Sequence, residues 1–148
     1  MIVGWFDKGH PTVVGALSID TLGYAHQAAF LADTGSYVTL LHPGDGQAGK
    51  LPYPTLPLVG KANQSLGLGA KASSYLVPAV LYLARTDGLW QPIQLDIAVA
   101  IPTPHNRTFP SILGWDVLQY FCMVSNRSNN IVQLRTCSLP TPCNITCV

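Results

Sequence analysis

Short apolar runs, each bounded by turn-forming residues, constrain the fold of this chain more than any other feature. Runs of this length are typical of strands, and the Gly and Pro residues between them interrupt long helices. We interpret as strands the runs Val13–Ile19, Gln27–Ala32, Tyr37–Leu41, Leu56–Gly60, Ser74–Ala84, Trp90–Ala100, Cys122–Asn126 and Ile131–Arg135. The sequence therefore predicts one domain of the all-β class, with a single short helix in the segment Trp115–Phe121.

The segments that connect these runs carry further signals. The glycine-rich segment Gly60–Lys71 indicates a β-hairpin, and the sequence HPGDG at His42–Gly46 indicates a turn. Pro78 lies inside the run Ser74–Ala84. Because proline has no N–H to donate, we expect that strand to have a free edge at this position.

The charge composition excludes several classes of function. Only 10% of the 148 residues are charged, the net charge is +1 and no basic run occurs, so nucleic-acid binding is not expected. No apolar stretch is long enough for a membrane span. The N-terminus lacks the features of a signal peptide, which favours an intracellular, cytoplasmic location. With so few charges, part of the surface is expected to be apolar and covered in an oligomer.

The cysteines and histidines show no metal-ligand spacing, so no metal site is expected. The cysteines are Cys122, Cys137, Cys143 and Cys147, and no Cys-x-x-Cys or nearby His accompanies them. Disulfides within the C-terminal tail stay an open alternative. The Asn-x-Ser/Thr triplets begin at Asn63, Asn106, Asn126 and Asn144, and they matter only if the chain is secreted.

One segment matches two phosphate-binding patterns. GDGQAGK, Gly44–Lys50, contains both G-x-G-x-x-G and G-x-x-x-x-G-K. Both patterns require a helix directly after the glycines, because the N-terminal amides of that helix hold the phosphate. The next residues, LPYPTLP, contain three prolines, which exclude such a helix. We therefore interpret this segment as a surface turn.

One carboxylate differs from the other acidic residues. Asp33 follows an apolar run and precedes Thr34 and Gly35. Burying a lone charge costs free energy unless the charge is paired or neutralised, so a partner or a function must be found for Asp33. Thr34 can hydrogen-bond across a tight interface, and Gly35 allows close approach of the backbone. The remaining carboxylates suit turns, segment ends, an exposed strand position or, for Asp116, the first turn of a helix.

Two motifs and their order resemble one family. FLADTGS (Phe30–Ser36) and SILGWDVL (Ser111–Leu118), with the glycine-rich hairpin between them, resemble the retropepsin-like aspartic proteases. The resemblance covers Val13 to Arg135. It implies a single-lobe acid-protease closed barrel, with a protease domain over residues 1–136 and a Cys- and Pro-containing tail over residues 137–148.

The resemblance also implies a partner for Asp33. Aspartic proteases use two carboxylates that share one proton, because like charges so close together cannot both ionise. One carboxylate is the general base toward water, and the other is the acid toward the scissile carbonyl. This chain carries Asp-Thr-Gly once. The implied enzyme is therefore a two-fold homodimer that cleaves an extended peptide or protein substrate and needs no cofactor.

The other functional positions of the family are carried over by matching the motifs. Thr34, Gly35 and Ser36 are expected to support the active site. The flap is expected at Gly60, Lys61 and Ala62, and the second motif at Ile112, Leu113, Gly114 and Asp116. The usual G-G-x-G-G flap tip is replaced by a longer and more polar sequence, GKANQSLGLG.

Two departures from viral members of the family predict local differences. Ser36 replaces a common Ala, and its hydroxyl could donate to the neighbouring carboxylate and lower the dyad's pKa. Tyr37 and Trp115 replace an acidic residue and an arginine that pair in many viral retropepsins. We expect these two aromatic rings to pack edge-to-face and to support the dimer.

Two alternatives from other functional classes stay open at this stage. The first is a catalytically silent retropepsin-like domain that dimerises or binds peptides. The second is a stabilising domain of a larger polyprotein. The intact sequence Asp33-Thr34-Gly35 favours the protease over the silent domain, whereas the polyprotein domain fits the Cys-rich tail but predicts little.

Overall fold

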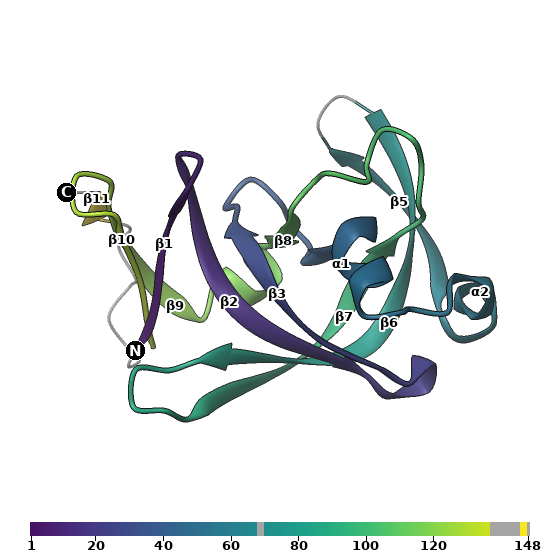
Figure 1. Cartoon of the computed structure of the whole chain (residues 1–148), viewed down its shortest axis with the longest axis horizontal. Coiled ribbons are helices and arrows are strands. Elements are labelled where there is room, and N and C mark those ends of the chain that lie inside the picture. The colour runs from purple at the N-terminus through teal and green to yellow at the C-terminus, as the bar shows by residue number, and fades with distance from the viewer. Residues whose placement is uncertain (68–69, 137–145, 148) are drawn as a thin grey trace.

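The computed structural model of the chain describes residues 1–67, 70–136 and 146–147, and strands dominate it (Figure 1). The strands are β1 (Ile2–Asp7), β2 (His10–Ile19), β3 (Tyr24–Ala32), β4 (Leu40–Leu41), β5 (Lys61–Gly67), β6 (Ala70–Ala84), β7 (Trp90–Ala100), β8 (Ser111–Leu113), β9 (Phe121–Asn126), β10 (Ile131–Thr136) and β11 (Thr146–Cys147). The helices are α1 (Pro43–Ala48), α2 (Leu56–Val59) and α3 (Trp115–Leu118), with 3-10 turns at Asp20–Leu22 and Tyr53–Thr55. The predicted β class is confirmed, and α3 lies where the short helix was expected.

Six of the strands close a barrel. The closed order is β2–β3–β8–β4–β7–β6, and β6 pairs again with β2. The pairs β3–β8 and β4–β7 are parallel, and the others in the ring are antiparallel. Strand β5 extends β6 into a hairpin at one end, whereas β1, β10, β9 and β11 continue from β2 at the other (Figure 1). Among the described residues, no helix has the length and apolar character needed to cross a membrane.

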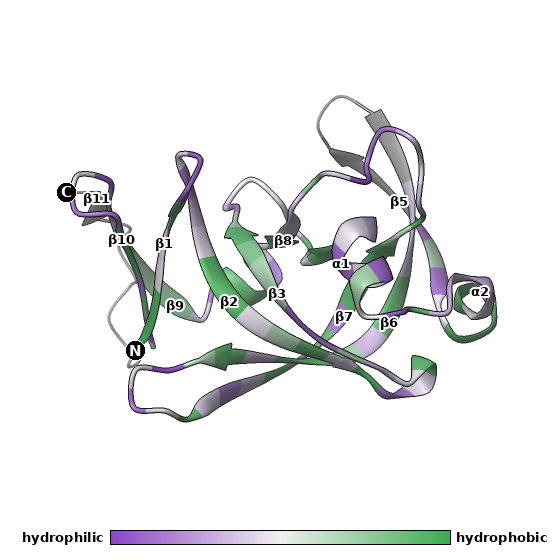
Figure 2. Cartoon of the chain, viewed as in Figure 1, coloured by the Kyte–Doolittle hydropathy of each residue, from purple (hydrophilic) through white to green (hydrophobic). Residues whose placement is uncertain are grey.

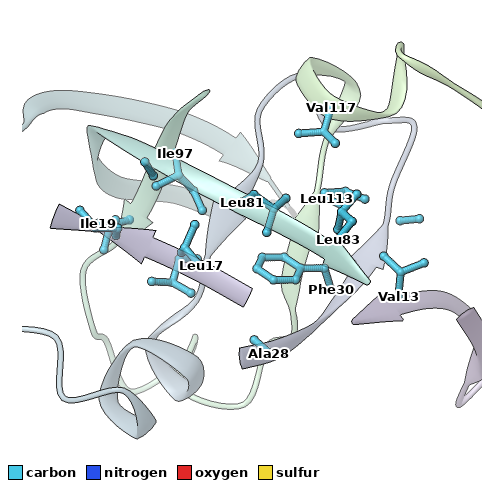
Figure 3. Close-up of a cluster of buried hydrophobic side chains, with 14 of the residues drawn as sticks. Val13, Leu17, Ile19, Ala28, Phe30, Leu81, Leu83, Ile97, Leu113 and Val117 are labelled. Atoms are coloured by element: carbon cyan, nitrogen blue, oxygen red, sulfur yellow. The ribbon is translucent and has the colours of Figure 1, made fainter. Parts of the chain in front are cut away.

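The barrel interior is filled by residues at alternating positions of its strands. On β2 the inward positions are taken by Val13, Leu17 and Ile19, which are nearly inaccessible to solvent. The ring of Phe30 lies beside Leu81 and Leu83 in the core (Figure 3). Gly15 leaves room for that ring, since a Cβ there would lie 3.1 Å from it. Figure 2 shows hydrophobic segments along β2, β3, β6 and β7, and a hydrophilic β1–β2 turn.

The long predicted strands are confirmed. Val13–Ile19, Gln27–Ala32, Ser74–Ala84 and Trp90–Ala100 lie within β2, β3, β6 and β7, and the last two predicted strands lie within β9 and β10. The free edge at Pro78 is also confirmed. Strand β6 pairs with β5 up to Leu76 and with β2 only from Val80 onward, so residues 77–79 have no strand partner on that side.

Two helices replace a predicted turn and a predicted strand. His42–Gly46 was expected to be a turn, but α1 begins at Pro43, with Asp45 in its first turn. Proline at a first helical position and an acidic first turn both favour a helix start. Gly46 is needed for another reason, since a Cβ there would lie 2.1 Å from the Tyr53 hydroxyl. The helix contains Gly44 and Gly46 of the phosphate-like motif and ends just before Gly49, so no helix follows the glycines directly.

Three other segments also differ from the structure predicted for them. The predicted strand Leu56–Gly60 is α2, in which Pro57 again occupies a position that tolerates proline at a helix start. Only Leu40–Leu41 of the predicted strand Tyr37–Leu41 pairs with neighbours. Strand β1 was not predicted at all, because its sequence IVGWFD contains a glycine and no clear alternation. A Cβ on that glycine, Gly4, would lie 1.9 Å from the carbonyl oxygen of Thr12.

Candidate active site

Asp33 lies at the carboxyl ends of two adjacent parallel strands. Strand β3 ends at Ala32 and pairs in register with Leu113 of β8. The Asp33 N–H then donates to the carbonyl oxygen of Leu113 at 3.0 Å, which continues this pairing by one step. The two motifs singled out in the sequence are therefore brought side by side, although about eighty residues separate them.

The loop after Asp33 holds the carboxylate with a backbone donor. The N–H of Gly35 donates to Asp33 Oδ1 at 2.9 Å, and the N–H of Ser36 donates to the Asp33 carbonyl at 3.2 Å. A Cβ on Gly35 would lie 3.2 Å from Asp33 Oδ1, which is tighter than an ordinary contact. Glycine therefore permits the close approach expected from the sequence. Asp33 is partly exposed to solvent.

The predicted role of the Ser36 hydroxyl is wrong. Ser36 Oγ donates to the carbonyl oxygen of Val38 at 2.8 Å and so turns along its own loop. No hydrogen bond joins it to the Asp33 carboxylate in the described part of the chain. Ser36 therefore braces the loop, and the proposed lowering of the dyad's pKa by this hydroxyl has no structural basis.

The backbone of the second motif is hydrogen-bonded to the backbone of this loop. The N–H of Trp115 donates to the Ser36 carbonyl at 2.7 Å, and the N–H of Asp116 donates to the Tyr37 carbonyl at 3.1 Å. A Cβ on Gly114 would lie 2.4 Å from the carbonyl carbon of Val38. Only glycine allows the two backbones to cross at this distance.

Asp116 and Thr39 join the two motifs by side-chain hydrogen bonds. Thr39 donates twice to the Asp116 carboxylate, from its N–H at 2.9 Å and from its hydroxyl at 2.7 Å. The same hydroxyl accepts the N–H of Gly114 at 3.1 Å. Sequence analysis placed Asp116 in the second motif and at the start of a helix, but it did not identify Thr39 as its partner. The available signal was a single threonine among the larger apolar and aromatic residues of the run YVTLL.

We expect the substitution Thr39→Val to destabilise the fold by about 1–3 kcal/mol. Valine has nearly the same shape, but it leaves the Gly114 N–H and one Asp116 oxygen without a partner at a fully buried position. Denaturant unfolding measures this loss, and Thr39→Ser, which keeps the hydroxyl, should lose less. A free energy of unfolding within about 0.5 kcal/mol of the wild type for Thr39→Val would contradict this role.

The rings of Tyr37 and Trp115 do not pack on each other. Tyr37 is 85% exposed and Trp115 is 41% exposed. In the described part of the chain the ring contacts are Tyr24–His26 and His42–Phe109. The predicted edge-to-face pair within one protomer is therefore wrong. Instead, the two residues line a hollow of about 400 Å³ together with Thr34, Gly35 and Ser36.

Comparison with known proteins identifies the fold. A retropepsin-like aspartic protease from Rickettsia conorii matches over 90% of this chain and 88% of its own, with 18% identity and a TM-score of 0.53. The chain has the retropepsin-like fold. The EIAV protease in complex with the inhibitor HBY-793 matches over 74% of this chain and 86% of its own, with 24% identity and a TM-score of 0.45. Neither the protein-family models nor the curated proteins gave a match.

The hairpin of this retropepsin-like fold that corresponds to the expected flap is formed by β5 and β6. Gly60, Lys61 and Ala62 lie at its base, where Lys61 pairs with Leu76. Gly60 makes the junction with α2, and a Cβ there would lie 3.0 Å from the Tyr75 Cβ. The residues 68–69 between the two strands lie outside the described part of the chain. The three residues named from the sequence thus support the hairpin from its base.

His42 supports the loop that leads into β8. Its side chain is buried, and Nδ1 lies 2.5 Å from the carbonyl oxygen of Pro110. The ring meets Phe109 edge-on, with centroids 5.6 Å apart. The His42 N–H donates to Ser111 Oγ, which in turn donates to Asp45 Oδ2 at 2.5 Å. His42 is therefore a buried histidine whose backbone and ring both have hydrogen-bond partners.

We expect His42 to make the fold less stable at acidic pH. Burial lowers the pKa of His42 below its ordinary value, and the Pro110 hydrogen bond opposes this only partly. The unfolded chain then binds the proton first, so stability falls as the pH drops below about 6.5. Thermal unfolding at several pH values should show a smaller loss for His42→Gln than for the wild type. The exposed His105→Gln is the control, and equal pH slopes in all three proteins would contradict the prediction.

Two further sequence expectations concern modification and the tail. The amide of Asn106 is 8% exposed, accepts the Thr103 N–H at 2.8 Å and donates to the Ile101 carbonyl at 2.9 Å. This Asn-x-Ser/Thr triplet therefore braces its loop in the folded chain.

Cys137, Cys143 and Asn144 lie outside the described residues, and so do any disulfides that they form.

Proposed function

We propose that this chain is an aspartic endopeptidase that works as a homodimer, with Asp33 contributed by each of two copies. The observation that carries the proposal is the placement of Asp33. It is a partly exposed carboxylate at the junction of β3 and β8, held by the Gly35 N–H, in a chain with the retropepsin-like fold. One carboxylate cannot serve as base and acid in the same step, and the sequence contains Asp-Thr-Gly once.

The chemistry follows from two carboxylates that share one proton. The ionised Asp33 takes a proton from a water molecule, whose oxygen attacks the scissile carbonyl carbon. The protonated Asp33 of the other copy donates its proton to the carbonyl oxygen, which gives a neutral tetrahedral diol. In the collapse of the diol, the Asp33 that took the water proton gives it to the leaving nitrogen, and the other Asp33 takes a proton from one diol hydroxyl as the C=O forms and the C–N bond breaks. The side chains supply every proton transfer, so no cofactor is required.

The substrate proposed for this site is an extended peptide segment. The β5–β6 hairpin presents an open strand edge, since β5 is at the end of the sheet order. An extended peptide can pair with such an edge through its backbone. The proposed protease domain covers residues 1–136, and the intact Asp33-Thr34-Gly35 loop favours it over a catalytically silent peptide-binding domain.

Peptide cleavage that is sensitive to pepstatin tests this proposal. The purified chain is incubated with a mixture of unstructured peptides at several acidic pH values, and new termini are identified by mass spectrometry. We expect cleavage that pepstatin suppresses and that metal chelators and serine- or cysteine-directed reagents leave unchanged. Peptide binding without new termini at any pH would instead identify a silent binding domain.

A further inference from the structure

The barrel wall has a gap beside β6. Residues 77–79 of this strand have no strand partner on the side where β5 ends and β2 begins to pair. A hollow of about 450 Å³ lies at the gap, between the end of β2 and the strands β6 and β7 (Figure 1). We refer to this hollow as the β6 groove, and its lining includes Asp20, Pro78, Val80, Leu95 and Asp96.

The β6 groove is separate from the candidate active site. It lies beside the 3-10 turn that precedes β3, whereas Asp33 directly follows the other end of that strand. The nine residues of β3, Tyr24–Ala32, span about 30 Å at 3.3 Å per residue. Within the described part of the chain, the groove shares no lining residue with the hollow beside Asp33. It is therefore a second site with its own chemistry.

Pro78 limits the kind of ligand that the gap can accept. A proline at an open strand position has no N–H, so a strand that paired with β6 here would lack a donor. Addition of a full strand is therefore disfavoured. The groove offers instead a mainly apolar lining, to which Pro78, Val80 and Leu95 contribute. Such a lining suits side chains that lie along it.

A carboxylate borders this apolar lining on each side of β6. Asp20 follows β2, the strand that pairs with Val80, and Asp96 lies on β7, where it pairs with Pro78. Two strand spacings of about 4.8 Å separate β2 from β7, which is about 10 Å. Both carboxylates are exposed, and neither forms an ion pair with a described residue. No basic side chain lines the groove, so its two negative charges have no counter-charge there.

We propose that the β6 groove binds an extended segment of a partner protein that carries arginine or lysine at alternate positions. Alternate side chains of an extended segment point to one face and start about 6.6 Å apart. Their length allows the two cationic groups to reach Asp20 and Asp96 on either side of β6. Their methylene stems cover the apolar lining between the carboxylates, which is how long basic side chains bury apolar surface while the charge stays in water.

This binding goes beyond peptide cleavage and does not depend on it. If the chain is the proposed protease, the groove is an exosite, a place away from the catalytic site that holds the same substrate. A substrate that occupies both sites needs at least about nine extended residues between its basic segment and its scissile bond. It should then have a lower KM than a short peptide with the same scissile bond, at the same kcat. This consequence alone rests on the proposed function.

Binding is measured by nuclear magnetic resonance on isotope-labelled Asp33→Asn chains, so that cleavage cannot consume the probe. The probe is the peptide acetyl-Arg-Ala-Arg-amide, and the control peptide carries citrulline, a neutral analogue, in place of each arginine. We expect the arginine peptide to shift the backbone amide signals of residues 18–21 and 94–96, and the citrulline peptide to leave them unchanged. Salt raised from about 0.05 to 0.5 M should weaken binding several-fold, since exposed charges are screened.

The decisive variants are Asp20→Asn and Asp96→Asn, made in the same chains. Each should raise the Kd of the arginine peptide about threefold, and the double variant about tenfold, as expected for exposed ion pairs. Asparagine at position 20 can still accept the Ser18 hydroxyl, so the turn should stay folded. The control is Asp7→Asn, which removes an exposed carboxylate outside the groove and should leave the Kd unchanged.

Several results would overturn the proposal. They are the absence of these amide shifts, equal binding of the citrulline peptide, and a Kd that the double variant leaves unchanged. Shifts confined to residues 34–37 would place the peptide in the hollow beside Asp33 instead. Equal affinity for arginine amide alone would assign the groove to a small cation and not to a peptide segment. Because binding is measured in inactive chains, failure of the wild type to cleave peptides would count against the proposed function alone.

Discussion

The substitution Asp33→Asn should abolish peptide cleavage and leave the dimer folded. The amide cannot take a proton from water at any accessible pH, and it cannot donate one as a carboxylic acid does, so both halves of the proton transfer are lost. We expect the rate to fall by a factor of at least about 1,000, which corresponds to about 4 kcal/mol of transition-state stabilisation. Asparagine Oδ1 can still accept the Gly35 N–H, so the loop geometry should survive.

The matched control for this substitution is Asp7→Asn. Asp7 is an exposed carboxylate on β1 that pairs with His10, and its removal changes the net charge by the same amount. Cleavage is measured with the peptide on which the wild type is fastest, and dimerisation by sedimentation. Residual activity of Asp33→Asn above about one part in a thousand would show that another group performs the chemistry. Loss of the dimer along with the activity would show that Asp33 is structural.

The β class could be predicted because the long strands are recognisable in the sequence as extended apolar runs. Val13–Ile19 and Trp90–Ala100 are longer than any turn, and over most of their length more buried and more exposed residues alternate as in strands. The parallel pairing of β3 with β8 was less visible, because nothing local connects Ala32 to Leu113. The two motifs in their order implied the closed barrel through the family resemblance, but this pairing itself was not predicted.

The short elements could not be predicted because tertiary contacts decide them. Gly46 can lie within α1 because it has no Cβ to clash with the Tyr53 hydroxyl, a relation that the local sequence does not show. Pro43 was assigned to a turn and Pro57 was taken to exclude a helix, yet each lies at a helix start, where proline is tolerated. Similarly, position 4 of β1 needs glycine because a Cβ there would clash with the Thr12 carbonyl oxygen on the neighbouring strand.

Within the candidate site, the sequence indicated which residues matter better than it indicated what they contact. Asp33 and Gly35 are arranged as expected, because Asp-Thr-Gly is a compact local motif. The hydrogen-bond partners of Ser36 and Asp116 were not predicted. The partner of a hydroxyl or a carboxylate depends on which donors and acceptors the tertiary structure brings within reach. Ser36 found the Val38 carbonyl, and Asp116 found Thr39 across the second motif.

Specific activity should fall when the enzyme is diluted below the dimer dissociation constant. A protomer holds one Asp33 in its site and cannot share a proton within it, so only the dimer is expected to be active. Far below the dissociation constant, the dimer concentration varies with the square of the protein concentration. Each tenfold dilution should then lower the specific activity by about tenfold. Initial rates across a dilution series, compared with sedimentation over the same range, measure this relation.

Mixing the wild type with Asp33→Asn chains separates a shared site from dissociation alone. If the two chains pair at random in equal amounts, only about a quarter of the dimers contain two intact Asp33 residues. At a fixed total concentration far above the dissociation constant, activity should fall to about a quarter of that of pure wild type. A value near one half would mean that each protomer acts by itself. Full independence of dilution in a chain that sediments as a monomer would lead to the same conclusion, and the dyad would then have to lie within one copy.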